Sequence, residues 1–156
     1  MRIRKLGMAL TTLLTVGAVL QRSARADEEK ETTTITFSAP FEIPGRILPA
    51  GSYIFERADD NELRNVVRIF NADRTVLYST LETNPVDRMS PTDSPSITLA
   101  EQGSGNPDAL VRWFYPGSLT GHEFVYAKPE AKELTQAKLD TFVGGRLVNG
   151  AQVAGE

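Results

Sequence analysis

The side chains that most often carry out chemistry are scarce in this chain. It has 156 residues, a single histidine, His122, and no cysteine. The lack of cysteine excludes thiol catalysis, iron–sulfur clusters and zinc sites built on sulfur. A serine-type triad would need His122 beside a serine and an acid, and the sequence has no Gly-x-Ser-x-Gly turn. We therefore assign no catalytic residue, no metal ligand and no cofactor, and we expect His122, which follows a glycine, in a surface turn.

Carboxylates are numerous, but they form no recognisable ligand pattern. Asp59-Asp60-Asn61-Glu62 lacks the alternate acidic positions, central glycine and final glutamate of a helix-loop-helix calcium loop, so a solvated turn is expected there. Any two of the 20 acidic residues could converge as the carboxylate pair that hydrolyses a glycosidic bond. Because the sequence selects no pair, a small secreted hydrolase acting on polysaccharide or cell-wall material is the alternative function and has no residues assigned.

Four aromatic residues are the candidates for ligand binding. Strand alternation places Trp113 and Tyr115 on one face, and it places Phe124 and Tyr126 on one face of the next strand. If these strands pair, an aromatic strip results. An exposed strip would stack on sugar rings or an apolar ligand, whereas a buried strip would belong to the core. The sequence leaves both interpretations open.

The same alternation orients the rest of the strand over residues 109–115. Val111 shares the face of Trp113, while Leu110, Arg112 and Phe114 share the other face. Because that second face carries a charge, we expect it to meet solvent, with the arginine stem covering Phe114.

The elements that must position these residues are short strands. Runs rich in valine, isoleucine and aromatics alternate with polar residues and are separated by proline, glycine and asparagine. Pro44-Gly45 fits a type II turn, with the glycine at positive φ, and the proline-rich 84–96 segment is expected to be an irregular loop. The pattern predicts an all-β, mainly antiparallel domain over residues 32–128, a β-sandwich or small β-barrel. The expected strands are 34–37, 41–43, 46–48, 52–57, 65–70, 75–82, 97–99, 109–115 and 123–126.

The amino-acid composition changes toward the end of the chain. Pro129, Glu130 and Glu133 suit the start of a helix, so one C-terminal helix is expected over residues 129–143. The Gly/Ala/Asn-rich residues 144–156 lack a periodic apolar pattern and are expected to be a disordered, flexible tail.

The N-terminus has the three parts of a signal peptide, over residues 1–26. Met1 to Lys5 carries only positive charges, Leu6 to Leu20 is apolar apart from threonines, and Ala24-Arg25-Ala26 provides the small residues of a cleavage site. Cleavage is expected before Asp27, which leaves residues 27–31 as a flexible leader. The apolar run of about 15 residues is shorter than the ~20 that span a bilayer. We therefore expect an exported protein, periplasmic or extracellular, with no membrane span after signal removal.

The net charge of the mature chain makes some classes of binding partner unfavourable. The signal holds five of the 17 basic residues and none of the 20 acidic ones, so residues 27–156 carry 12 basic and 20 acidic residues, a net charge of −8. This charge argues against nucleic acid and anionic lipid surfaces as partners. A glycan, a peptide or an envelope protein remains as the expected partner.

Three stretches of the sequence carry a resemblance to known proteins. They are Ile43 to Tyr53, Asn65 to Asn71, and Trp113-Phe114-Tyr115-Pro116-Gly117 together with Glu123-Phe124-Val125-Tyr126. In these stretches the chain resembles a group of short secreted bacterial β-rich proteins with no assigned activity. The resemblance implies one secreted β domain and brings no catalytic residue with it. The expected function is therefore that of an exported non-catalytic β module.

Overall fold

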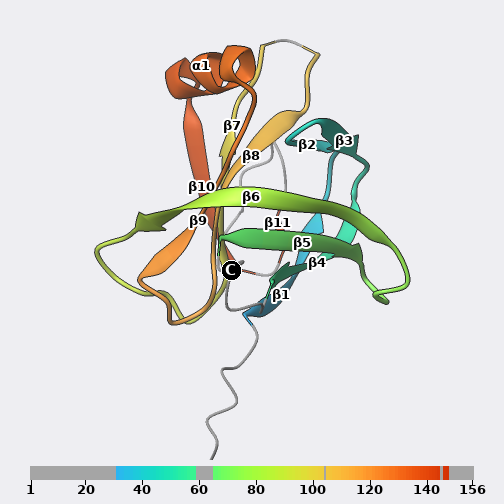
Figure 1. Ribbon diagram of the computed structural model, residues 1–156, viewed down its shortest axis with the longest axis vertical. Coiled ribbons are helices and arrows are strands. Elements are labelled where there is room, and N and C mark those ends of the chain that lie inside the picture. Colours follow the sequence, from blue (N-terminus) through green and yellow to red (C-terminus); the bar gives the residue numbers. More distant parts are fainter. Residues whose placement is uncertain (1–30, 59–64, 104, 145, 148–156) are drawn as a thin grey trace, which may run out of the picture.

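A computed structural model describes residues 31–58, 65–103, 105–144 and 146–147 (Figure 1). The predicted signal peptide with its cleavage residues Ala24, Ala26 and Asp27, and the Asp59-Asp60-Asn61-Glu62 segment, lie outside the described residues. The strands are β1 (Thr32–Phe37), β2 (Phe41–Ile43), β3 (Arg46–Leu48), β4 (Gly51–Arg57), β5 (Val66–Asn71), β6 (Leu77–Asp87), β7 (Ser96–Ala100), β8 (Asp108–Phe114), β9 (Thr120–Phe124), β10 (Leu139–Val143) and β11 (Arg146–Leu147); the helix is α1 (Lys128–Gln136).

The predicted fold class, mainly antiparallel β with one C-terminal helix, is confirmed. The strands follow the order β10-β7-β8-β9-β6-β5-β4-β1-β11, and β2 pairs with β3 and β8. The long strand β6 belongs to both halves, because its first part pairs with β5 and its last part pairs with β9. Figure 1 shows β6 running across β9 and β10, with β5 alongside β6. The two ends of the described sheet, β10 and β11, do not pair with each other, so no closed barrel is found among the described strands. The half that contains β4 packs as one layer on the half that contains β8, through contacts such as that of Phe55 with Trp113.

One hydrophobic core lies between these layers. Trp113 of β8 is fully buried and its ring centroid lies 5.9 Å from that of Phe55 on β4. Its indole Nε1 donates a hydrogen bond of 3.0 Å to Thr33 Oγ1 on β1. Phe37 and Phe41 stack at 3.6 Å and are buried in the same core. A single core thus joins the two layers of the described residues.

Two turns have backbone geometry that explains their sequence. Gly45 has φ 74°, as the predicted type II turn requires. Arg74, in the loop between β5 and β6, has φ 61°, a conformation that is strained for a side chain other than glycine. Its guanidinium lies 2.7 Å from the carboxylate of buried Glu56, which favours this arginine over a glycine at the turn.

The predicted helix over residues 129–143 is too long. Helix α1 ends at Gln136, Ala137 is extended with ψ 152°, and β10 then pairs antiparallel with β7 from Leu139 to Val143. The apolar stripe of the helix is weak, and none of its residues is fully buried. Pairing with the open edge of β7, whose five residues are all buried, therefore outweighs continued helix.

Two further expectations are corrected by strand pairing. The first part of the predicted 84–96 loop is strand, because β6 continues to Asp87 along β9. Within the predicted disordered tail, Arg146 and Leu147 pair in parallel with Thr36 and Phe37 of β1. Residues 145 and 148–156 lie outside the described part of the chain. In both cases the strand is formed by pairing with a strand that is distant in the sequence. A local sequence pattern carries no information about such a partner.

Candidate functional site

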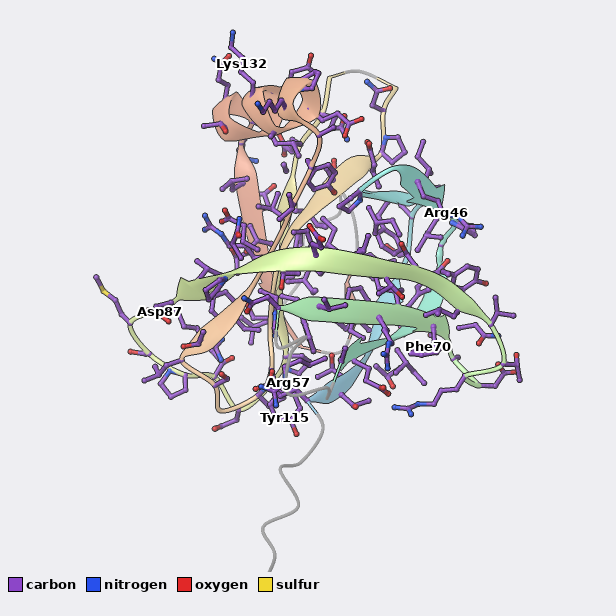
Figure 2. All side chains as sticks on the ribbon, viewed as in Figure 1. Arg46, Arg57, Phe70, Asp87, Tyr115 and Lys132 are labelled. Atoms are coloured by element: carbon purple, nitrogen blue, oxygen red, sulfur yellow. The ribbon has the colours of Figure 1, made fainter. Side chains whose placement is uncertain are left out.

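The predicted aromatic strip belongs to the core. Trp113 is fully buried, Phe124 and Tyr126 are 4% and 9% exposed, and Tyr115 is partly buried against the core. In the β8–β9 pairing, the residue opposite Trp113 is His122. Figure 2 shows Tyr115 at the end of the molecule opposite Lys132 of α1. The four residues therefore offer no continuous aromatic face for a sugar ring.

The prediction of which side chains of β8 face solvent is also wrong in part. Leu110 is fully buried because β8 has an extra residue, Val111, opposite the step from Thr98 to Leu99 of β7. This bulge turns Leu110 to the side of Trp113. Phe114 is 6% exposed, covered by the guanidinium of Arg88 at 4.7 Å from its ring centroid.

His122 is buried on β9, which corrects its expected position in a surface turn. Its ring stacks on Trp113 with centroids 5.2 Å apart. Nδ1 lies 3.0 Å from Thr83 Oγ1, and Nε2 lies 3.5 Å from Glu31 Oε2. The pattern Gly121, His122, Phe124 contained a signal for this, because His122 and Phe124 share the buried face by alternation.

An acid, a histidine and a hydroxyl in a row have the order of a catalytic triad, but this group lacks what a nucleophile needs. Thr83 is buried and donates its hydroxyl proton to the Asn65 carbonyl at 3.0 Å. Neither of the two cavities described below is lined by Glu31, Thr83 or His122. Thr83 is 4% exposed, so its hydroxyl presents little surface to a substrate, and we assign no catalytic residue to this group.

A cleft beside α1 brings together carboxylates from distant elements. This acidic cleft has a volume of about 290 Å³. Its lining residues are Glu42, Glu101, Gln102, Gly103, Asn106, Tyr126, Glu130, Glu133, Leu134, Gln136 and Ala137. Four of them are glutamates and none is lysine or arginine. A concave site with one sign of charge concentrates ions of the opposite sign.

The local structure around the acidic cleft explains how its carboxylates are held. Glu130 and Glu133 lie one helical turn apart on α1, so both side chains occupy one face. Glu42 of β2 accepts a hydrogen bond from Gln102 Nε2 in the β7–β8 loop. Glu101 is paired with Lys138, whose Nζ lies 2.8 Å from Glu101 and 3.2 Å from Asp140.

Tyr126 forms the floor of the acidic cleft. Its hydroxyl donates to the Leu110 carbonyl at 2.9 Å and lies 3.2 Å from the Glu42 carbonyl, which ties β2 to β8. Burial, followed by the negative charges of Glu42 and Glu130, raises the pKa of Tyr126 well above its ordinary value. The phenol is therefore neutral and structural, and the charged groups that line the cleft are its carboxylates.

A second cavity of about 310 Å³ lies on the other side of α1. Its lining includes the predicted candidates Phe124 and Tyr126, and the Arg112–Glu123 ion pair of 2.8 Å. The two cavities share Tyr126 and Leu134, so α1 lies between them. Because Phe124 and Tyr126 expose little surface, this cavity offers an apolar wall and no aromatic platform.

No protein-family model matches the chain, and comparisons with curated proteins and with solved structures also find no match. Within the described residues, no group of three or more His, Asp or Glu side chains is placed to hold a metal ion. No helix in the described part is long and apolar enough to cross a membrane. The acidic cleft is thus identified by its geometry and charge. Sequence reasoning missed it because Glu42, Glu101 and Glu130 lie far apart in the chain.

Proposed function

We propose that this chain is an exported, non-catalytic β module whose acidic cleft binds a positively charged segment of a peptide or envelope protein. The observation that carries the proposal is a concave site with four glutamates and no basic residue in its lining. Carboxylate oxygens pair with the ammonium of lysine and bind the guanidinium of arginine through two parallel hydrogen bonds. A basic side chain entering the acidic cleft would relieve the repulsion among these carboxylates.

Charge and packing favour a cationic peptide over a glycan. Sugar rings are bound by stacking on exposed aromatic faces, and the faces of Trp113, Phe124 and Tyr126 are buried. The net charge of −8 over residues 27–156 adds a long-range attraction for a basic partner. A peptide or envelope protein is therefore preferred among the three ligand classes that the sequence suggests.

Export is part of the proposal and rests on the N-terminal sequence. The charged start, the apolar run and Ala24-Arg25-Ala26 support cleavage before Asp27, in the periplasm or at the cell exterior. The intact mass of the protein collected from those compartments should correspond to a chain that begins at Asp27. A membrane-bound product that retains Met1 would contradict this.

Binding is tested by titrating residues 27–156 into a fluorescent oligolysine and following its anisotropy. The double variant Glu130→Gln/Glu133→Gln should weaken binding roughly tenfold, since each exposed ion pair is worth up to about 1 kcal/mol. The matched control is Glu82→Gln/Asp93→Asn, which removes two negative charges at exposed residues that line neither cavity. Equal losses in the two double variants would mean that only net charge attracts the peptide, and would contradict a site in the acidic cleft.

The acidic cleft also favours a second candidate function, the small secreted hydrolase. It places several carboxylates around one cavity, and glycoside hydrolysis needs two of them as acid and as base or nucleophile. This candidate predicts that cell-wall polysaccharide is turned over and that a single substitution, Glu42→Gln, Glu101→Gln, Glu130→Gln or Glu133→Gln, abolishes turnover. The binding module predicts no release of reducing ends by the unmodified protein.

A further inference from the structure

Strand β10 lies at one end of the described sheet and has an open edge. Among the described strands it pairs with β7 alone, in a regular register over the five residues Leu139 to Val143. Two other described strands also have a single partner, but they are shorter, since β3 has three residues and β11 has two. Open edges are commonly blocked by lysine, proline or a bulge, and residues 139–143 contain none of these.

The hydrogen bonds to β7 determine which backbone groups of β10 point outward. The Lys138 carbonyl accepts a hydrogen bond of 2.9 Å from Glu101, and the Gly144 amide donates one of 2.8 Å to Pro95. In a regular antiparallel pair every second residue is bonded to the partner strand, so the even-numbered residues of β10 face β7. The amides and carbonyls that point away from β7 belong to Leu139, Thr141 and Val143.

The same three residues carry the exposed side chains of β10. Leu139 and Val143 are 42% and 57% exposed, and Thr141 is exposed between them. The one charged residue of the strand, Asp140, lies on the other face, where its carboxylate is 3.2 Å from Lys138 Nζ. The open edge therefore combines outward backbone groups with apolar side chains and brings no unpaired charge.

We propose that this edge pairs with the same edge of a second copy of the chain, in a two-fold symmetric dimer with the two β10 strands antiparallel. With the axis at Thr141, Leu139 of each copy lies opposite Val143 of the other, and the two Thr141 residues face each other. All outward amides and carbonyls of these three residues are then hydrogen-bonded, and the dimer continues the sheet of one copy into that of the other.

Self-complementarity favours a second copy over an unrelated extended segment. In this register apolar residues face apolar residues and threonine faces threonine, which are pairs that stabilise a ladder. Asp140 lies opposite Phe142 of the other copy, so like charges are not opposed. The dimer is independent of the acidic cleft, because no residue of β10 lines that cleft.

The size and charge of the interface determine how the dimer should behave. Five residues on each side bury less than the about 1,200 Å² of a standard interface, so we expect weak association. Each copy carries a net charge of −8 over residues 27–156, so added salt should strengthen the dimer by screening this repulsion. Salt should have the opposite effect on a cationic peptide in the acidic cleft, which separates this proposal from the proposed function.

Sedimentation equilibrium of residues 27–156, from micromolar to millimolar protein, tests the dimer. Val143→Lys places a charge in the interface and should weaken dimerisation roughly tenfold or more. The matched control is Ile47→Lys on the β3 edge, which is also 57% exposed, makes the same change of charge and should leave the dimer in place. A protein that stays monomeric at every concentration, or an equal effect of the two variants, would overturn the proposal.

Amide hydrogen exchange tests the register without any substitution. In dilute protein the outward amides of Leu139, Thr141 and Val143 should exchange fast, whereas those of Asp140 and Phe142, which face β7, should be protected. At high concentration the three outward amides should become protected as well, which gives an alternating response along the strand. Protection of all five amides that does not depend on concentration would mean that another segment of the chain already covers the edge, and would overturn the proposal.

Discussion

At the scale of single residues, Gly121 is a position where one added methyl group should lower stability. A Cβ added there would lie 2.5 Å from Phe114 Cδ1, and the guanidinium of Arg88 lies over the same ring. Overpacking of this kind costs about 1–3 kcal/mol, so Gly121→Ala should lower the urea midpoint of unfolding. The control is Gly103→Ala, whose added Cβ meets nothing within 4 Å. Equal midpoints for the two variants would contradict the packing of Phe114 described above.

Glu31 should make stability depend on pH on the acidic side. Its hydrogen bond with His122 is the main cause that holds the pKa of Glu31 below its ordinary value, with Arg57 adding to this and burial opposing it. A carboxyl with a lower pKa in the folded state stabilises the protein above its unfolded pKa, and this contribution is lost as the pH falls through the folded pKa.

The free energy of unfolding should therefore differ between the unmodified protein and Glu31→Gln at about pH 5.5, and the difference should shrink as the pH falls toward about 3. Urea unfolding at a series of pH values measures it. A difference that stays constant down to that pH would show that the carboxylate charge contributes nothing.

Single residues also show where the sequence was sufficient and where it was not. Alternation along β8 predicted the inward position of Trp113, because that rule holds locally. It failed for Leu110, since the bulge at Val111 is created by the pairing with β7. His122 was expected in a turn because Gly121 precedes it, whereas this glycine leaves room for the Phe114 ring. The neighbours that decided these cases come from other strands.

At the scale of elements, β10 should matter far more than the end of the chain. All five residues of β7 are buried between β8 and β10, so loss of β10 would expose an apolar strand and its backbone groups. A chain ending at Leu147 should unfold cooperatively and near the melting temperature of residues 27–156. A chain ending at Gln136 should lose cooperative unfolding. Calorimetry compares the two, and equal melting temperatures would contradict the role of β10.

The strands through β8, apart from the second half of β6, and the turn at Pro44-Gly45 were predictable, because period-two alternation and turn residues are local signals. The next strand was expected at 123–126, whereas β9 runs from Thr120 to Phe124 along the end of β6. Strand β10 was not, since Leu139 to Val143 follow a good helix start and only the edge of β7 makes them extended. The same reason applies to β11, which pairs with β1 at the other end of the chain.

At the scale of the whole molecule, the choice between sandwich and barrel depended on whether the end strands pair with each other, and no local sequence pattern predicts that pairing.

The acidic cleft is also a property of the whole molecule. The net charge of the mature chain is visible in the sequence, but the convergence of Glu42, Glu101 and Glu130 follows from the parallel pairing of β2 with β8 and from the position of α1. The net charge could be predicted from the sequence, but the gathering of four glutamates around one cleft could not.

An NMR titration can show whether a cationic peptide binds in the acidic cleft. Oligolysine is added to labelled residues 27–156 and the amide shifts are followed residue by residue. We expect saturable shifts concentrated at Gln102, Gly103, Asn106 and α1, which disappear in Glu130→Gln/Glu133→Gln and persist in Glu82→Gln/Asp93→Asn. Shifts centred on other acidic residues, or spread evenly over the surface, would contradict it.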